Sequence, residues 1–430
     1  MRHPDDRAIL TLAAPALGAL AAEPLYSLVD TALVGHLGTA ELGAAAVAGA
    51  AFTAFFWLFS FLAYGVTPRV ARALALGDDR SAAETGMQAV LLALSAGVVV
   101  GVLGWFISGW VTTVLGATGD VARLGAPYLR IRFIGLPALL LIQVGHGWLR
   151  GAGRNASAMK VAVGGAVVNA ALAYLLIYPL DLGLNGAAIA TVISQSGAAL
   201  AFLLLLRRPL AATARRVDPP AMRSLLTVAG HLSVRTGSAL AAITLSASLA
   251  TRMGQVSLGA WQVTNQLFLL FSLMLDAIAI AGQSLVAAAI GAEPTEARRV
   301  SGRLLEWGTA GGILFGAAIF SLRGPIASLF SDDPAVIEKT TDLLAWLGVT
   351  QPLMALAFTF DGILIGAFET RYLAGAMALS SALYAAVSIF GYTQGWDVAA
   401  LAAGATVWMV ARVATAAARV RSSTWPRPLP

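Results

Sequence analysis

Long apolar runs, separated by short polar gaps, recur along the whole chain. Each run approaches the roughly 20 residues that an α-helix needs to cross the apolar core of a bilayer. The pattern predicts twelve spans, at 8–34, 43–72, 84–107, 124–149, 157–179, 185–206, 224–250, 258–289, 302–321, 340–367, 372–391 and 396–418. The chain is therefore expected to be an all-α polytopic membrane protein with twelve transmembrane helices.

The two halves of the chain resemble each other. Short motifs recur 215 or 216 positions later: Leu42-Gly43-Ala44 as Leu258-Gly259-Ala260, and Pro137, Gly147 and Gly151 as Pro352, Gly362 and Gly366. Several matches at nearly one offset indicate a duplication, and six spans per half make the repeats parallel. We expect two pseudo-symmetric six-helix lobes at 1–206 and 224–418, a cytoplasmic linker at 207–223 and a C-terminal tail at 419–430.

Basic residues are distributed unevenly between the gaps. The N-terminus, the even-numbered connections and the C-terminus carry 21 Arg or Lys, whereas the odd-numbered connections carry four. Cytoplasmic loops are enriched in Arg and Lys, so both termini are expected in the cytoplasm. The predicted location is the plasma or inner membrane, with the lipid bilayer around a multi-pass chain.

Composition excludes several classes of protein. Hydrophobic residues make up 58% of the chain and charged residues 12%, and the mean hydropathy is +0.78. These values exclude a soluble enzyme, a nucleic-acid partner and a disordered chain. The chain has no Cys, and it lacks GxxxxGK[ST], HExxH and GxSxG motifs. We therefore expect no catalytic residues, cofactor or metal site, and transport driven by an ion gradient is the simplest function.

Charged side chains inside the spans are candidates for function, because burying a charge in the bilayer is costly. Asp30 lies near the outer end of the first span, which also contains Pro15 and Pro24. Each Pro permits a bend, and a bendable helix with one carboxylate suits proton coupling. A cap or an ion pair is the alternative role for Asp30. The expected hydrogen-bond partners of its deprotonated form are Tyr26, Thr31 and Asn169.

A second group of candidates lies mainly in the C-terminal half. Asp276 and Asp361 lie inside the eighth and tenth spans, where an ion pair with Arg235, Arg130 or Arg132 is the alternative to a functional role. Amide side chains that could line a cavity are Gln143, Gln262, Asn265, Gln266 and Gln283. Three of them, at 262, 265 and 266, follow helical spacing and share one face. His146 is expected to be a helix-packing residue.

The order of these residues resembles the multidrug and toxic compound extrusion (MATE) family, in its DinF-like subgroup. The similar segments are Pro24 to Gly38 (PLYSLVDTALVGHLG), Tyr128 to Arg132 with Gly147 to Gly151, Gly186 to Thr191, Leu275-Asp276 and Phe360-Asp361-Gly362. The resemblance implies a two-lobed antiporter that works by alternating access. It would export small organic, often cationic, compounds against inflow of H⁺ or Na⁺, and we expect the monomer to be functional.

The resemblance also assigns roles to residues. It makes Asp30 the coupling carboxylate of the first lobe and matches Asp361 with an acid of the second. Asn169 fits the start of an Asn-x-x-Leu-Asp pattern, but Ala173 stands at its Asp position, and the seventh span lacks the Glu of some Na⁺-coupled members. Both departures favour H⁺, because a hard cation needs several oxygen ligands.

Two other functions stay open at this point. A flippase for a lipid-linked precursor would share the architecture and need a wide cationic cavity, which Arg130, Arg132 and Arg235 could supply. A non-transporting receptor or scaffold is less consistent with duplicated halves and acids inside the spans.

Overall fold

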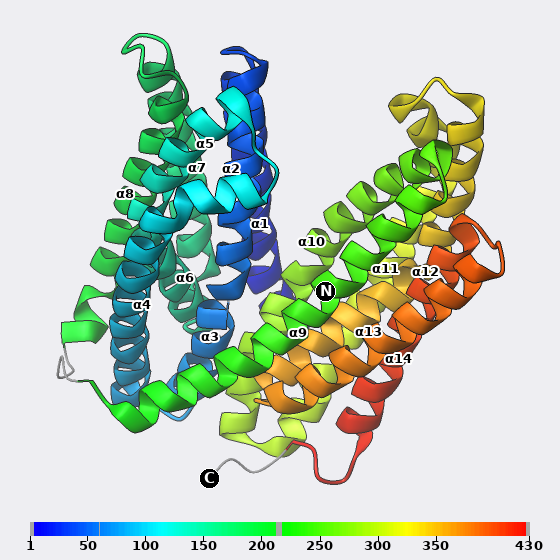
Figure 1. Cartoon of the computed structure of the whole chain (residues 1–430). Helices are drawn as coiled ribbons and strands as arrows, with labels where there is room; N and C mark the ends of the chain where they lie inside the picture. The colour runs from blue at the N-terminus through cyan, green and yellow to red at the C-terminus, as the bar shows by residue number, and fades with distance from the viewer. Residues whose placement is uncertain (1–3, 60, 212–216, 427–430) are drawn as a thin grey trace. The chain divides into compact units, whose positions relative to one another are not determined.

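The computed structural model describes residues 4–59, 61–211 and 217–426. Within these ranges there are fourteen helices and no strand (Figure 1). Their bounds are α1 (Pro4–Gly35), α2 (Thr39–Phe59), α3 (Phe61–Ala75), α4 (Asp79–Val114), α5 (Gly119–Ile134), α6 (Leu136–Gly151), α7 (Asn155–Ile177), α8 (Gly183–Ala211), α9 (Pro219–Arg252), α10 (Gln255–Ala292), α11 (Pro294–Phe330), α12 (Pro334–Gly366), α13 (Thr370–Thr393) and α14 (Val398–Arg421). The pairs α2/α3 and α5/α6 fall in the second and fourth predicted spans, so the helices follow the twelve-span pattern.

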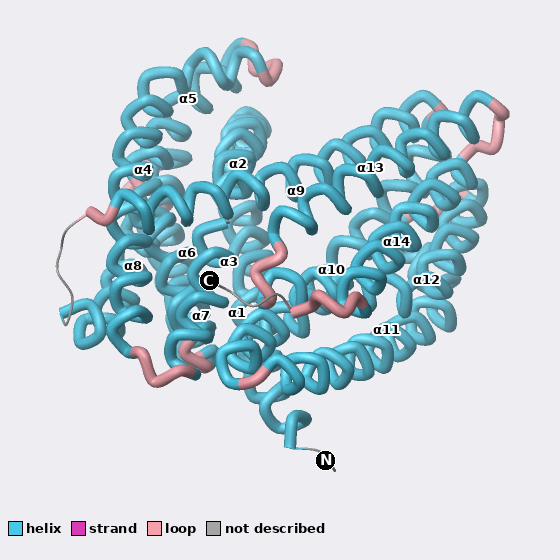
Figure 2. Tube along the Cα trace, turned by 90° about the horizontal axis from the view of Figure 1, so that it is seen from below, coloured by secondary structure: helices cyan, strands magenta, loops and turns pink. Residues whose placement is uncertain are grey.

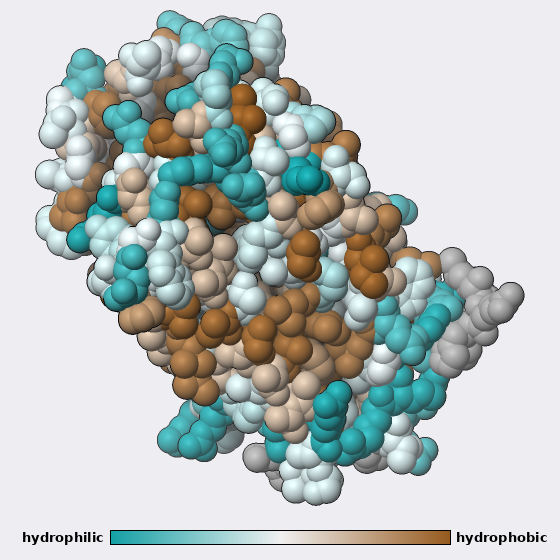
Figure 3. All heavy atoms as spheres, turned by 90° about the vertical axis from the view of Figure 1, so that its right-hand side faces the viewer, coloured by the Kyte–Doolittle hydropathy of each residue, from teal (hydrophilic) through white to brown (hydrophobic). Residues whose placement is uncertain are grey.

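The helices have the length and surface of membrane spans. In the described ranges, ten helices are long and apolar enough to cross a bilayer. The number is eleven if α5 and α6, which are bent by 48° relative to each other, are counted as one span. Large apolar side chains are exposed on several helices, among them Phe106, Trp110 and Leu314. On the face in Figure 3, hydrophobic residues gather in a broad band, with hydrophilic residues toward its ends. Such a surface suits lipid, which confirms a multi-pass membrane protein.

Packing divides the chain into two compact units. We call Ala14–Ala229 the N-lobe, and Gly230–Pro430 together with the first thirteen residues, described from Pro4, the C-lobe. Both boundaries lie inside a helix. Helix α1 therefore begins in the C-lobe and continues in the N-lobe, whereas α9 does the reverse.

The same close helix crossings occur in both lobes. In the N-lobe, a β-carbon on Gly147 of α6 would lie 2.8 Å from the carbonyl oxygen of Ala63 on α3. In the C-lobe, a β-carbon on Gly362 of α12 would overlap the carbonyl of Ala279 on α10. A second pair of crossings repeats likewise, Gly97 against Pro137 and Gly312 against Pro352. These contacts recur at the sequence shift of 215 or 216 and confirm the duplication.

The last two helices of each half also pack as equivalent pairs. In Figures 1 and 2, α7 runs beside α8 in the N-lobe, and α13 runs beside α14 in the C-lobe. The halves differ elsewhere: α12 is continuous, but its N-lobe counterpart is divided into α5 and α6. Gly135 lies at this division.

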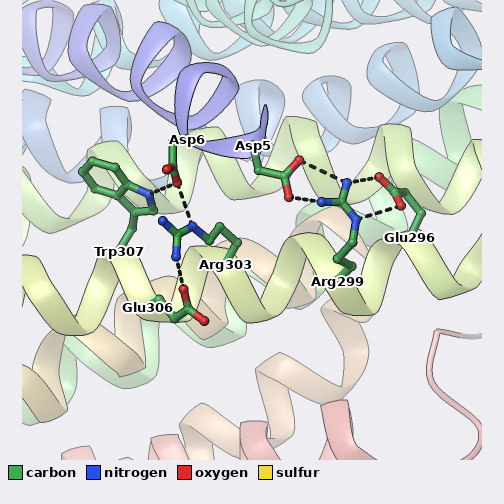
Figure 4. A network of polar contacts seen from close by, with 7 residues as sticks. All are labelled: Asp5, Asp6, Glu296, Arg299, Arg303, Glu306 and Trp307. Atoms are coloured by element: carbon green, nitrogen blue, oxygen red, sulfur yellow. Dashed lines mark hydrogen bonds and ion pairs between the residues drawn. The ribbon is translucent and has the colours of Figure 1, made fainter. Parts of the chain in front are cut away.

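The first turn of α1 is held on α11 by ion pairs within the C-lobe (Figure 4). Asp5 accepts two hydrogen bonds from Arg299, at 2.6 and 3.1 Å. The buried Asp6 accepts one from Arg303 Nε at 2.7 Å and one from Trp307 Nε1 at 2.9 Å. Arg299 and Arg303 also pair with Glu296 and Glu306, respectively, on α11 itself.

Candidate functional site

The N-lobe contains a cavity of about 210 Å³, lined by residues of α1, α2, α5, α6, α7 and α8. Ala22 and Tyr26 contribute the wall on α1, and Phe52 and Phe202 add aromatic surface. The polar side chains on which the site depends are Tyr26, Arg132, Gln143, His146, Asn169 and Gln195. An apolar pocket with a few converging polar groups is the usual form of a small-molecule site.

A chain of hydrogen bonds connects three helices at this cavity. Thr191 of α8 donates to the carbonyl of Ala187 at 3.0 Å, so its oxygen is an acceptor for the Tyr26 hydroxyl, which lies 3.0 Å away. Asn169 of α7 donates from Nδ2 to Thr191 and to Ser194, each at 3.2 Å. The predicted residues Tyr26 and Asn169 therefore belong to one network, joined through Thr191, which sequence analysis did not single out.

Asp30 lies one helical turn after Tyr26 on α1 and is partly buried. Its Oδ1 atom is buried without a hydrogen-bond partner among the described residues. Tyr26 and Asn169 are bonded to Thr191 here, and Thr31 is on an exposed face of α1, so their bonds to deprotonated Asp30 stay a prediction. The opposite charge that acts on Asp30 is Arg132, although the two form no ion pair within 4 Å.

Arg132 and His146 both line the cavity, and their contacts there could not be predicted from the sequence. The Arg132 guanidinium lies 4.5 Å from the centre of the Phe52 ring, donates a long, 3.4 Å bond to the Tyr26 hydroxyl and also interacts with the Tyr128 side chain. The His146 ring lies 4.8 Å from that of Phe202, so it does pack, but it also lines the cavity with Nδ1 buried and unbonded. A histidine and an arginine on neighbouring apolar helices were the available signal.

In the C-lobe, Asp361 of α12 lies between two arginines. It accepts a hydrogen bond of 2.8 Å from Arg412 of α14, and a second bond from Arg235 of α9. Asp361 is 5% exposed and Arg412 is 6% exposed, and the Arg412 guanidinium also lies over the Trp408 ring. The ion-pair alternative for Asp361 is thus the observed arrangement. Arg412, which lies inside the twelfth predicted span and was not among the candidate partners, is the second, buried member of this ion-pair arrangement.

Of the three amide side chains predicted to share one face of α10, one lines a cavity. Asn265 lines a C-lobe cavity of about 70 Å³, but Gln262 and Gln266 are exposed and do not border it. Asp276 is partly buried on the same helix, and Gln283 is 1% exposed with Oε1 unbonded. In the N-lobe, Gln143 lines the cavity of about 210 Å³.

Known proteins resemble this chain over nearly its whole length. The MatE family model matches residues 15–175 and 241–393. The Arabidopsis thaliana protein DETOXIFICATION 44, chloroplastic, is 31% identical, and the match covers 97% of this chain and 82% of that protein. DNA damage-inducible protein F of Escherichia coli (strain K12) is 28% identical over 88% of this chain and 84% of its own.

A solved structure has the same fold. The outward-facing conformation of a multidrug resistance MATE family transporter of the MOP superfamily superposes with a TM-score of 0.87. The superposition covers 97% of this chain and 95% of that one, at 21% sequence identity.

Proposed function

The chain belongs to the MATE family of membrane transporters, and we propose that it is a secondary exporter that exchanges small organic compounds for H⁺ by alternating access. In this proposal the monomer is the working unit, and both termini face the cytoplasm, consistent with the Arg and Lys distribution. The observation that carries the coupling role is the position of Asp30, whose buried Oδ1 atom has no hydrogen-bond donor among the described residues.

Protonation of Asp30 would change the first helix itself. A deprotonated carboxylate with an unbonded buried oxygen is costly, whereas the protonated group tolerates a dry environment. Helix α1 carries Asp30 and also forms the cavity wall at Ala22 and Tyr26, with Pro24 between them. A shift of α1 that follows protonation would therefore reshape the cavity in which substrate binds.

Two features favour H⁺ over Na⁺ at Asp30. Ala173 is fully buried one turn after Asn169, at the position where the family pattern has Asp, so a second carboxylate is lacking there. Arg132, which acts on Asp30 electrostatically, supplies N–H donors there and not the oxygen ligands that a Na⁺ ion would need. A proton needs neither several oxygen ligands nor a net negative site.

Transport in proteoliposomes tests the exporter and its ion. Purified protein would be reconstituted, and the movement of ethidium and of 2-naphthoate would be followed under an imposed pH gradient or an imposed Na⁺ gradient. We expect the pH gradient to drive at least one probe and the Na⁺ gradient alone to drive neither. Transport by Na⁺ alone would overturn H⁺ coupling, and failure of both gradients would overturn the exporter.

The same vesicles test the flippase alternative. A fluorescent phospholipid in the inner leaflet would report scrambling through its accessibility to dithionite. The N-lobe cavity, at about 210 Å³, favours a small molecule over a lipid-linked precursor. We expect no scrambling above that of protein-free vesicles, and rapid scrambling would favour the flippase.

A further inference from the structure

The described residues around the N-lobe cavity give it a positive charge. Among the described residues that line it, Arg132 is the only Arg, Lys, Asp or Glu side chain. Asp30 is near enough to act on Arg132 electrostatically but does not line the cavity. A cationic ligand in this space would therefore meet a guanidinium and no wall carboxylate.

Arg132 is also poorly satisfied in comparison with the other arginines inside the lobes. Arg235 and Arg412 both donate to Asp361 in the C-lobe. Arg132 has a cation–π contact with Phe52, one long hydrogen bond to Tyr26 and an interaction with Tyr128, and none of these partners is an acid. A guanidinium inside the bilayer is stabilised chiefly by an anionic partner, and the described protein residues do not supply one within 4 Å.

We propose that the N-lobe cavity binds a small organic anion, whose carboxylate or phosphate group pairs with Arg132. The planar guanidinium offers parallel N–H donors that match the oxygens of either group. Gln143 and Gln195 provide further amide groups, and the wall also includes His146, whose Nδ1 atom has no hydrogen-bond partner among the described residues. The aromatic and aliphatic remainder of the wall suits an apolar body attached to the anionic group.

This proposal rests on the exporter function and specifies its substrate class. An anion on Arg132 and a proton on Asp30 do not compete through charge, because the proton removes a negative charge that acts on the guanidinium. Exchange would instead depend on α1, which carries Asp30 and forms the wall at Ala22 and Tyr26. A shift of α1 that follows protonation would close the space that the anion needs.

Binding to the purified full-length protein in detergent tests the site directly. The probes are 2-naphthoate, 2-naphthyl phosphate and the cation 2-naphthylmethylammonium, which share one ring system and differ in the charged group. We expect both anions to bind at least tenfold more tightly than the cation. The two anions distinguish carboxylate from phosphate recognition. Equal or tighter binding of the cation would overturn the proposal.

A pair of variants two residues apart separates this role from a general effect of charge. Arg132→Gln should weaken anion binding tenfold or more, and Arg132→Lys should retain part of it. Arg130 is exposed and stacks on Trp105 outside the cavity, so Arg130→Gln should bind the anions like the wild type. If Arg132→Gln does not fold, the anion preference of the wild type and of Arg132→Lys decides the question.

Counter-charges on α1 provide two further controls. Asp30→Asn should not abolish anion binding, because Asp30 does not line the cavity. The Glu23 side chain lies outside the described residues, so Glu23→Gln is measured alongside it. Ethidium transport under a pH gradient without anion binding would overturn the anion site and leave the exporter intact. Anion binding without transport of any probe would overturn the exporter function and leave the anion site intact.

Discussion

Arg412 donates a hydrogen bond of 2.8 Å to Asp361 in the interior of the C-lobe. Arg235 donates to the same carboxylate oxygen, Oδ2, so one acid neutralises part of the charge of two guanidinium groups. This arrangement connects α9, α12 and α14. It assigns Asp361 to the architecture of the lobe more directly than to ion coupling.

Replacing Asp361 should therefore destabilise the protein. Asp361→Asn would leave two positive charges in a buried site without their acid, and we expect a loss of about 3 kcal/mol or more in the free energy of unfolding. Thermal or denaturant unfolding in detergent measures the change. Glu84→Gln is the matched control, because Glu84 forms an exposed i,i+4 pair with Arg80 and its loss should cost about 0.5 kcal/mol or less.

An unchanged stability of Asp361→Asn, together with loss of transport driven by a pH gradient, would contradict this interpretation. Asp361 would then be the coupling acid, and the ion pairs would be part of the transport cycle. The melting temperature and the transport rate separate these roles, because a residue with a structural role lowers the melting temperature when it is replaced, whereas a coupling acid need not.

The crossing of α12 over α10 should tolerate no side chain at Gly362. A β-carbon there would overlap the backbone of Ala279, and a backbone carbonyl cannot move aside as a flexible side chain would. We expect Gly362→Ala to destabilise the C-lobe by about 1–3 kcal/mol. The unfolding transition of the purified variant measures this loss.

Gly375 provides the contrast, because nothing lies within 4 Å of a β-carbon at this exposed position inside α13. Gly375→Ala should stabilise the protein by about 0.5–1 kcal/mol through the better helix propensity of Ala. Similar effects at Gly362 and Gly375 would show that the crossing is looser than the structure indicates.

The fold could be predicted well from the sequence, because membrane spans produce long apolar segments and a duplication produces motifs that recur at a constant offset. Hydropathy located the spans, and the recurrence of Gly147 and Gly151 at Gly362 and Gly366 reflected crossings that both lobes use. The pattern did not reveal that residues 4–13 pack with the C-lobe. That association depends on ion pairs between Asp6 and Arg303, nearly three hundred residues apart, which no local periodicity encodes.

The candidate site was predicted only in part for the same reason. Asp30, Tyr26 and Asn169 share a region, but the partners of a polar group inside a bundle come from other helices. Arg412 lies inside the predicted twelfth span, but the sequence could not show that it pairs with Asp361 of another helix. Helical spacing placed Gln262 and Asn265 on one face, but it could not show where the small C-lobe cavity ends.

The first turn of α1 should depend on Asp6. Asp6→Asn removes the charge that pairs with Arg303, and we expect a loss of about 2 kcal/mol in the free energy of unfolding. Trp307→Phe removes one neutral donor to the same carboxylate and should cost about 1 kcal/mol. A double-mutant cycle between Asp6 and Trp307 should show coupling, because Trp307 donates to the Oδ1 atom of Asp6, which also accepts the bond from Arg303.

Asp120→Asn is the control for that experiment. Asp120 pairs with Arg123 at an exposed site on α5, where an ion pair is worth about 0.5 kcal/mol or less. If Asp6→Asn were as mild as Asp120→Asn, the network in Figure 4 would be no more than a surface contact.

Asp30→Asn should separate transport from folding. The amide mimics the protonated acid and leaves no buried negative charge, so we expect the variant to fold with wild-type stability or better. It should lose transport driven by a pH gradient by at least tenfold, because the side chain no longer takes up and releases a proton. Proteoliposomes with an imposed pH gradient measure the rate, and Thr31→Val, at an exposed position on the same helix, should transport normally. Wild-type transport by Asp30→Asn, with the same pH dependence, would show that another group couples the proton, and His146 in the N-lobe cavity would be the next residue to test.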